Sequence, residues 1–98
     1  MTIQKELHEN TLFVAVEGRL DTTTAPDLEK SLRENMEDAE KLVLDFSELE
    51  YISSAGLRVL LMAQKTMAKK EGMKVTGVNE LISEIFEVTG FTEILEIE

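Results

Sequence analysis

Two consecutive serines, Ser53 and Ser54, are the residues of this chain best placed to take part in chemistry. They stand in the segment YISSAGLRVLL, directly before an apolar run that is typical of a helix. A serine at a helix start can cap it by accepting a hydrogen bond from a first-turn amide. The same hydroxyl can carry a phosphate, which the positive end of the helix dipole favours. The next residues, Ala55 and Gly56, are small enough to let a partner approach closely. From the residues alone, capping and modification both remain open.

Other constellations that could support catalysis are missing. The single histidine, His8, falls in a predicted turn, and there is no cysteine. A transition-metal site would have to rest on carboxylates alone. Neither glycine-rich phosphate-binding motif occurs. The segment GRLDTTTAP, residues 18–26, could hold a phosphate, but ordinary threonine capping also explains it. We therefore expect a binding protein with no cofactor, no metal and no enzymatic activity of its own.

The charge of the chain is acidic and unevenly distributed. Its 98 residues include 20 acidic and 10 basic side chains, for a net charge of -10. Such a surface repels nucleic acid and anionic membranes, so neither is an expected partner. Residues 51–70 contain no Asp or Glu, whereas residues 79–98 contain no Lys or Arg. The two serines therefore begin the one locally positive segment, which carries Arg58, Lys65, Lys69 and Lys70.

The hydrophobic pattern predicts a single α/β domain over residues 1–98. We expect strands at 2–7 and 11–18 joined by a turn, a helix within 20–37 and a buried strand at 41–47. A helix at 54–70, a strand at 73–78, a helix at 79–90 and a last strand at 93–97 follow. This order predicts a mixed, largely parallel sheet with an N-terminal antiparallel hairpin, packed against three main helices. No apolar run is long enough to span a bilayer and no signal segment is evident, so we expect a cytoplasmic protein.

The predicted helix at 54–70 divides into two arcs. The apolar arc, expected to pack on the sheet, contains Leu57, Leu60, Leu61, Ala63, Met67 and Ala68. The opposite arc contains Arg58, Lys65 and Lys69, with Met62 among them. An exposed methionine is an adaptable contact for a partner, although isolated exposed apolar residues are also ordinary. We expect the basic arc and the serines to share one recognition surface.

The chain resembles the anti-sigma factor antagonists of the STAS domain family, the domain shared with cytoplasmic parts of sulfate transporters. The resemblance covers nearly the whole length and rests on EGRLD, LVLDFSELEYISSAGLRVLL and VNELISEIFEVTGF. It implies a single STAS domain. The family places a phosphorylatable serine in a pattern like Asp-Ser-Ser/Thr-Gly-Leu. Aligned on Gly56 and Leu57, the pattern implies that Ser54 is phosphorylated and that Ser53 replaces the usual Asp.

The resemblance also implies a partner switch. The unmodified protein would bind an anti-sigma factor, itself a serine kinase of the GHKL type, and so free a sigma factor for transcription. Phosphorylation of Ser54 would end the binding, and a metal-dependent serine phosphatase would restore it. The expected partner-binding residues are Asp21, Ser53, Ser54, Ala55, Gly56, Arg58, Met62 and Lys65. The resemblance places Asp21 in the loop beside the serine, where it serves equally well as a turn residue.

Two other functions stay open. The chain could be a cytoplasmic STAS subunit of a lipid or anion transporter, with no obligatory phosphorylation. It could also be a regulatory module that binds a small molecule or nucleotide through residues 18–26 and the start of the helix at 54.

Overall fold

The computed structural model describes residues 1–98. Its strands are β1 (Thr2–His8), β2 (Thr11–Leu20), β3 (Lys41–Asp45), β4 (Leu49–Ile52), β5 (Met73–Thr76) and β6 (Glu96–Ile97). Its helices are α1 (Ala25–Asn35), α2 (Ser54–Met67) and α3 (Glu80–Thr89), with short 3-10 turns η1 (Met36–Asp38) and η2 (Phe91–Glu93). The β1–β2 pair is antiparallel and every other strand pair is parallel, which confirms the predicted fold class.

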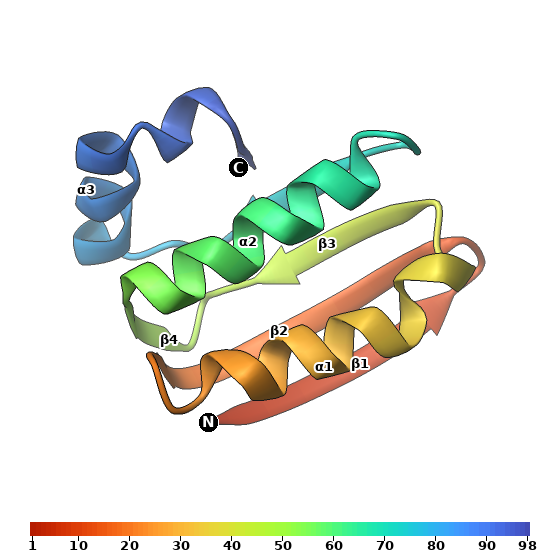
Figure 1. Ribbon diagram of the computed structural model, residues 1–98, viewed down its shortest axis with the longest axis horizontal. Helices are drawn as coiled ribbons and strands as arrows, with labels where there is room; N and C mark the ends of the chain where they lie inside the picture. Colours follow the sequence, from red (N-terminus) through yellow and green to blue (C-terminus); the bar gives the residue numbers. More distant parts are fainter.

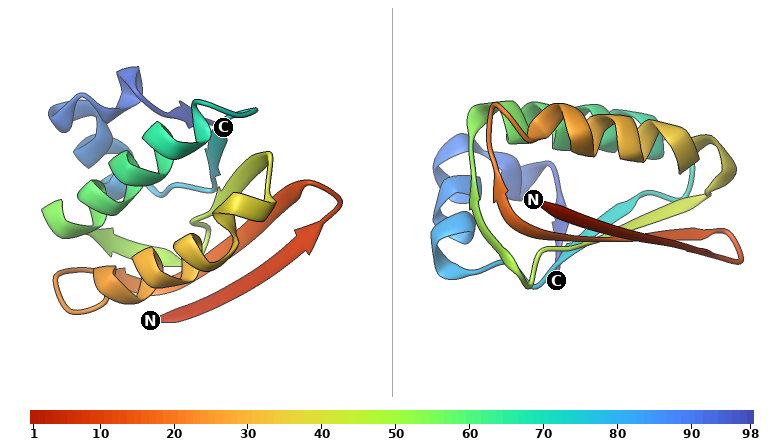
Figure 2. Two further views of the ribbon diagram at one scale, coloured as in Figure 1. Left: turned by 45° about the vertical axis from the view of Figure 1, so that its right-hand side comes forward. Right: turned by 90° about the horizontal axis from the view of Figure 1, so that it is seen from below.

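The molecule has one helical layer on one face of its sheet. The strands lie in the order β1-β2-β3-β5-β6, and β4 pairs with β2. Helices α1 and α2 lie side by side on one face, and α3 stands at the end where α2 begins (Figures 1 and 2). The core contains 24 buried hydrophobic residues and no buried polar or charged residue. Every polar or charged residue therefore keeps part of its surface accessible to solvent.

Helices α1 and α2 bury the stripes that their sequences predict. Leu28 and Leu32 of α1 are fully buried, as are Leu60, Ala63 and Met67 of α2, at the spacing of one helical face. Leu61, on the predicted apolar arc, is only half-buried. Two further positions at this helix and its end differ from the prediction. Ala68 is exposed because the helix ends at Met67, and Val59 is buried because α1 packs along that flank.

Strand β4 was not predicted, and it determines where the candidate site lies. The ten residues of β2 are long enough to pair with β3 over the first half and with β4 over Gly18, Arg19 and Leu20. The register shifts between Gly18 and Arg19, and Gly18 has a φ of 105°, which a residue with a side chain rarely adopts. The sheet bends here, so that β2 and β4 turn toward the helical layer (Figure 2).

The chain also differs from the predicted boundaries near its C-terminus. Residues 91–93 form the turn η2, so the last strand is only Glu96–Ile97.

After α2, the Nζ of Lys70 donates to the carbonyl oxygens of Met36, Glu37 and Ala39, at 2.8, 3.1 and 2.7 Å. Lys70 thus satisfies the carbonyls that follow α1, a role that only the tertiary structure reveals.

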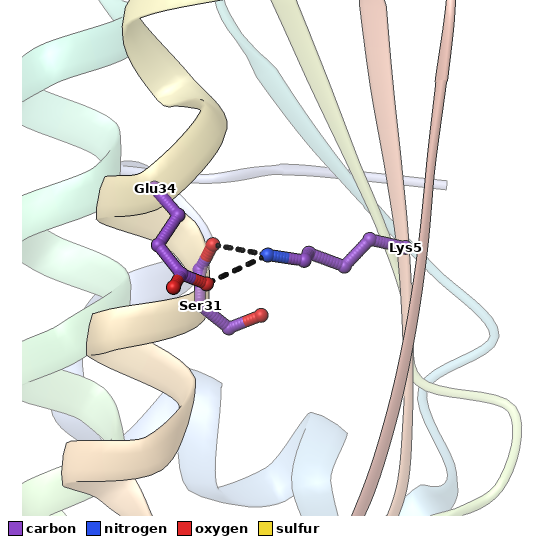
Figure 3. Close-up of polar contacts among 3 residues, drawn as sticks. All are labelled: Lys5, Ser31 and Glu34. Carbon is purple, nitrogen blue, oxygen red and sulfur yellow. Dashed lines mark hydrogen bonds and ion pairs between the residues drawn. The ribbon is translucent and has the colours of Figure 1, made fainter.

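A second lysine ties the N-terminal hairpin to α1. Figure 3 shows Lys5, from β1, with its Nζ 2.9 Å from the Oε1 of Glu34 and 3.2 Å from the carbonyl oxygen of Ser31. The hydrogen bond from Lys5 lowers the pKa of Glu34 below its ordinary value.

No helix has the length and hydrophobicity that crossing a bilayer requires.

Candidate partner-binding surface at the start of helix α2

Two parallel strands end together and bring Asp21 and Ser53 to one edge of the sheet. Leu20, at the end of β2, pairs with Ile52, at the end of β4, and the amide of Ser53 donates to the carbonyl of Leu20 at 2.9 Å. The loop that begins at Asp21 and the segment that begins at Ser53 therefore leave the sheet side by side. The pairing of β2 with β4 thus accounts for the neighbourhood that the family resemblance implied.

The two serines have different environments. Ser53 is the N-cap residue, with extended backbone (φ -99°, ψ 177°), and its carbonyl accepts from the amide of Leu57 at 2.9 Å. Its hydroxyl makes no capping bond and is buried without a hydrogen-bond partner. Ser54 is the first residue of the helix and is exposed. Neither serine side chain caps the helix, and Ser54 does not occupy the N-cap position, because the extended backbone ends one residue earlier. Of the two hydroxyls, only that of Ser54 is open to solvent.

Gly56 is small for a reason that lies inside the protein. It is buried, and a Cβ at this position would stand 2.7 Å from the Cγ of Leu20 and 2.8 Å from the Cγ1 of Ile52. The residues that end β2 and β4 therefore require glycine here. Of the two small residues, only Ala55, which is half-buried at the surface, can allow a partner to approach closely.

Asp21 organises its own loop. Its Oδ1 accepts from the amide and hydroxyl of Thr23, at 3.0 and 2.8 Å, and from the amide of Thr24 at 3.2 Å, and the Thr24 hydroxyl oxygen also lies 3.2 Å away. These bonds, above all the one from the Thr23 hydroxyl, lower the pKa of Asp21. The Thr24 hydroxyl also donates to the carbonyl of Arg19 at 2.7 Å and does not cap α1. Two of the three threonine hydroxyls of residues 18–26 are thus already engaged, which disfavours a nucleotide phosphate there.

The basic arc of α2 is accessible. Arg58 and Lys65 are exposed, and Arg58 lines a shallow groove between α1 and α2 together with Thr22 and Ala55. Met62 is less exposed than predicted, because part of its side chain packs against the core. No group of three or more His, Asp or Glu side chains is arranged to hold a metal ion. The surface therefore offers a hydroxyl, cations and apolar contact.

One pair of residues at this edge of the sheet was not predicted. The guanidinium of Arg19 lies 4.5 Å from the ring centre of Tyr51, a cation–π contact between directly paired residues of β2 and β4. A signal was present in the sequence: Arg19 precedes Asp21, and Tyr51 precedes Ser53, by the same two residues. That equal spacing matches the parallel register, but it is informative only once β4 is known to be a strand.

Comparison with known proteins identifies the family. The model of the family described as "Mlab, STAS domain" matches residues 3–96. The chain therefore belongs to the STAS domain family. It is 28% identical to the anti-sigma-B factor antagonist of Bacillus subtilis, over 99% of this chain and 90% of that protein. It is 29% identical to the anti-sigma-B factor antagonist of Listeria monocytogenes, over 96% of this chain and 84% of that protein.

Solved structures agree with this assignment. The crystal structure of an anti-sigma factor antagonist from Mycobacterium paratuberculosis matches with a TM-score of 0.89 and 28% identity, covering 98% of this chain and 83% of that one. The phosphorylated form of SpoIIAA, from Bacillus, matches with a TM-score of 0.76 and 14% identity, covering 99% and 91%. This second likeness is one of fold alone.

Proposed function

We propose that this chain is an anti-sigma factor antagonist whose binding to an anti-sigma factor is switched off by phosphorylation of Ser54. The anti-sigma factor would be a serine kinase of the GHKL type, and a metal-dependent serine phosphatase would reverse the modification. Relatives that match over nearly their whole length are named anti-sigma factor antagonists, which supports the general role. The observation that carries the switch is the exposed Ser54 hydroxyl at the start of a helix that has no acidic side chain.

The binding surface would consist of Ser54, Ala55, Arg58, Met62 and Lys65, with Asp21 at its border. Ser53 and Gly56 would contribute from beneath, because the hydroxyl of Ser53 is buried and Gly56 is covered. Cations in an otherwise acidic protein would orient a partner that presents carboxylates, and they would act mainly on the rate of association.

A phosphate on Ser54 would be tolerated by the fold and rejected by the interface. At a helix N-terminus, the dipole and free amides favour an anion, so the domain should stay folded. The modification adds about -1.5 to -2 units of charge at a surface where a partner packs closely. In a kinase site, the phosphate on Ser54 would lose its hydration and be repelled by the nucleotide phosphates. Together these effects would cost several kcal/mol of binding free energy, and each ~1.4 kcal/mol lowers the affinity tenfold.

The test is incubation with the candidate anti-sigma kinase and ATP, followed by mass spectrometry and a binding measurement. Ser54→Ala should resist modification and stay bound, whereas Ser54→Asp should fold and bind poorly. Ser53→Ala is the matched control, because its hydroxyl is buried: it should be modified and released like the parent protein. A phosphate found on Ser53, or tight binding by Ser54→Asp, would contradict the assignment.

The basic arc of α2 should contribute to binding of the same partner. Arg58→Ala should weaken binding of the anti-sigma factor by ~1 kcal/mol or more, because an exposed cation in the interface is lost. Its unfolding free energy should change by less than about 0.5 kcal/mol, since the side chain is solvated. Lys41→Ala, on the open face of the sheet, is the control and should leave binding unchanged. Equal losses of binding in the two variants would show that general charge, and not the α2 surface, holds the partner.

A further inference from the structure

Helix α3 has an apolar arc wider than its own packing uses. Ile82 and Phe86 are fully buried, but Leu81 is 48% exposed and Val88 is 84% exposed. At about 100° per residue, Leu81, Ile85 and Val88 fall at i, i+4 and i+7 on one side of the buried pair. We call these three residues the α3 stripe. Ile85 is only partly buried, so the stripe joins the core on one side and faces solvent on the other.

The fold does not need this stripe in order to hold α3. The side chain of Asn79 accepts from the amide of Ile82 at 2.8 Å and donates to the carbonyl of Leu49 at 3.0 Å, which caps the helix and fixes it to β4. At so exposed a position, valine is a poorer helix former than alanine, glutamate or lysine. Exposed apolar residues are ordinary when they occur singly. Three at helical spacing, continuous with the core, form a patch that a partner can cover.

The border of the stripe has one sign of charge. Glu80, Glu84 and Glu87 are exposed on the adjoining arc of α3. None of the three ion pairs in the protein includes them, and residues 79–98 contain no Lys or Arg. The potential along this arc is therefore negative and uncompensated by its own segment. An apolar strip beside an acidic edge favours a partner that has apolar residues with basic residues beside them.

That chemistry points to a protein. Nucleic acid and anionic membranes carry the same sign of charge as the border and are repelled. The α3 stripe of a second copy would bring two acidic borders together. We propose that the α3 stripe is a docking surface for an amphipathic helix of a partner protein, one with apolar residues at i, i+3, i+4 and i+7 and with Lys or Arg beside them. Ridges on two such helices interdigitate, and the basic residues meet Glu84 and Glu87.

This surface is distinct from the one assigned to the phosphorylation switch. It belongs to α3, its charge is acidic where that of α2 is basic, and its contacts do not involve Ser54. Helix α3 stands at the end of the sheet where α2 begins (Figures 1 and 2).

A synthetic helical peptide tests the proposal with a readout at single residues. The probe has about 18 residues, or five turns, with leucines on one stripe and lysines beside them. Added to the 15N-labelled full chain, it should shift amide resonances mainly at residues 79–89. A control peptide of the same composition, with its leucines scattered around the helix, should bind at least tenfold more weakly. The difference isolates the apolar stripe from attraction by charge alone.

Variants of the chain complete the test. Leu81→Ser combined with Val88→Ser should weaken the probe by about tenfold, and Val88→Ser alone, at the most exposed position, should act in the same direction. Glu84→Gln combined with Glu87→Gln should weaken binding severalfold and flatten its salt dependence. Phe13→Ser, a 44% exposed apolar residue of β2, is the matched control and should bind like the parent chain.

Three results would overturn the proposal. Equal binding of the scattered peptide, with shifts spread over the acidic surface, would show attraction by charge only. Unchanged binding by Val88→Ser and by the double serine variant would remove the stripe from the contact. Shifts at 79–89 that grow with protein concentration in the absence of peptide would show that a second copy covers the stripe.

Discussion

Ser53 and Ser54 have the same side chain, yet the backbone between them gives the two hydroxyls different environments. The extended conformation of Ser53 turns its hydroxyl into the protein, and the first helical residue, Ser54, faces solvent. A kinase needs a hydroxyl that it can reach, so accessibility alone favours Ser54 as the substrate. The resemblance to the family selects the same residue by alignment, and the two arguments are independent.

Gly56 gives a prediction about stability. Gly56→Ala should lower the unfolding free energy by about 1–3 kcal/mol, because the new methyl group meets Leu20 and Ile52 at distances that require a shift. Chemical denaturation measures the loss, and Arg58→Ala, two residues along the same helix, is the control that should stay within about 0.5 kcal/mol. An unchanged or higher stability for Gly56→Ala would show that the helix moves outward without cost.

At the scale of elements, Lys70 holds together the end of α1 and the segment after α2. Lys70→Met keeps much of the aliphatic stem but removes the three hydrogen bonds to Met36, Glu37 and Ala39. We expect a loss of about 1–3 kcal/mol in unfolding free energy, since these carbonyls lose charged donors. Lys69→Met, at the exposed neighbouring position, should have little effect. Equal unfolding midpoints for the two variants would mean that water replaces the ammonium group fully.

The elements also show which parts of the fold were predictable. Helices α1, α2 and α3 were predicted because apolar residues recur at helical spacing over several turns of each one. Strand β4 was missed because Leu49–Ile52 is too short to show a period, and its partner is set by the bend at Gly18. In the site, sequence located Ser54 and the exposed Arg58 and Lys65. The sequence alone could not predict that the hydroxyl of Ser53 is buried, why position 56 is glycine, or that Arg19 contacts Tyr51. Each of these features depends on the pairing of β2 with β4.

At the scale of the whole molecule, three ionisable groups, Asp21, Glu34 and Lys74, link stability to pH. The pKa values of Asp21 and Glu34 lie below their ordinary values of 3.8 and 4.5, because each carboxylate accepts hydrogen bonds in the folded state. Their contributions are complete above those ordinary values and are lost as pH falls through the lowered folded pKa. The pKa of Lys74 is raised above 10.5 by its hydrogen bond to Glu98, so its contribution is lost as pH rises through the raised folded value.

Asp21→Asn isolates one of these contributions. At neutral pH the variant should unfold at a lower temperature than the parent chain, because a neutral amide accepts the threonine hydrogen bonds less strongly. The difference should disappear in acid, below the folded pKa of Asp21, where the parent carboxyl is also neutral. Asp38→Asn, in η1, provides a control for the change in net charge. A difference that persists unchanged into acid would assign the effect to shape and not to ionisation.

The division of β2 between two partners has a consequence for the protein as it is synthesised. The last three residues of β2, Gly18, Arg19 and Leu20, pair with β4 and with no other strand. Their hydrogen bonds to β4 cannot all form until Ile52 has left the ribosome. At about 5–20 residues per second, this end of β2 presents an unpaired strand edge beside the apolar Leu20 for a time on the order of seconds. Unpaired edges template association between chains. Variants that weaken β4 would therefore lower the yield of soluble chain more than their effect on the finished fold implies.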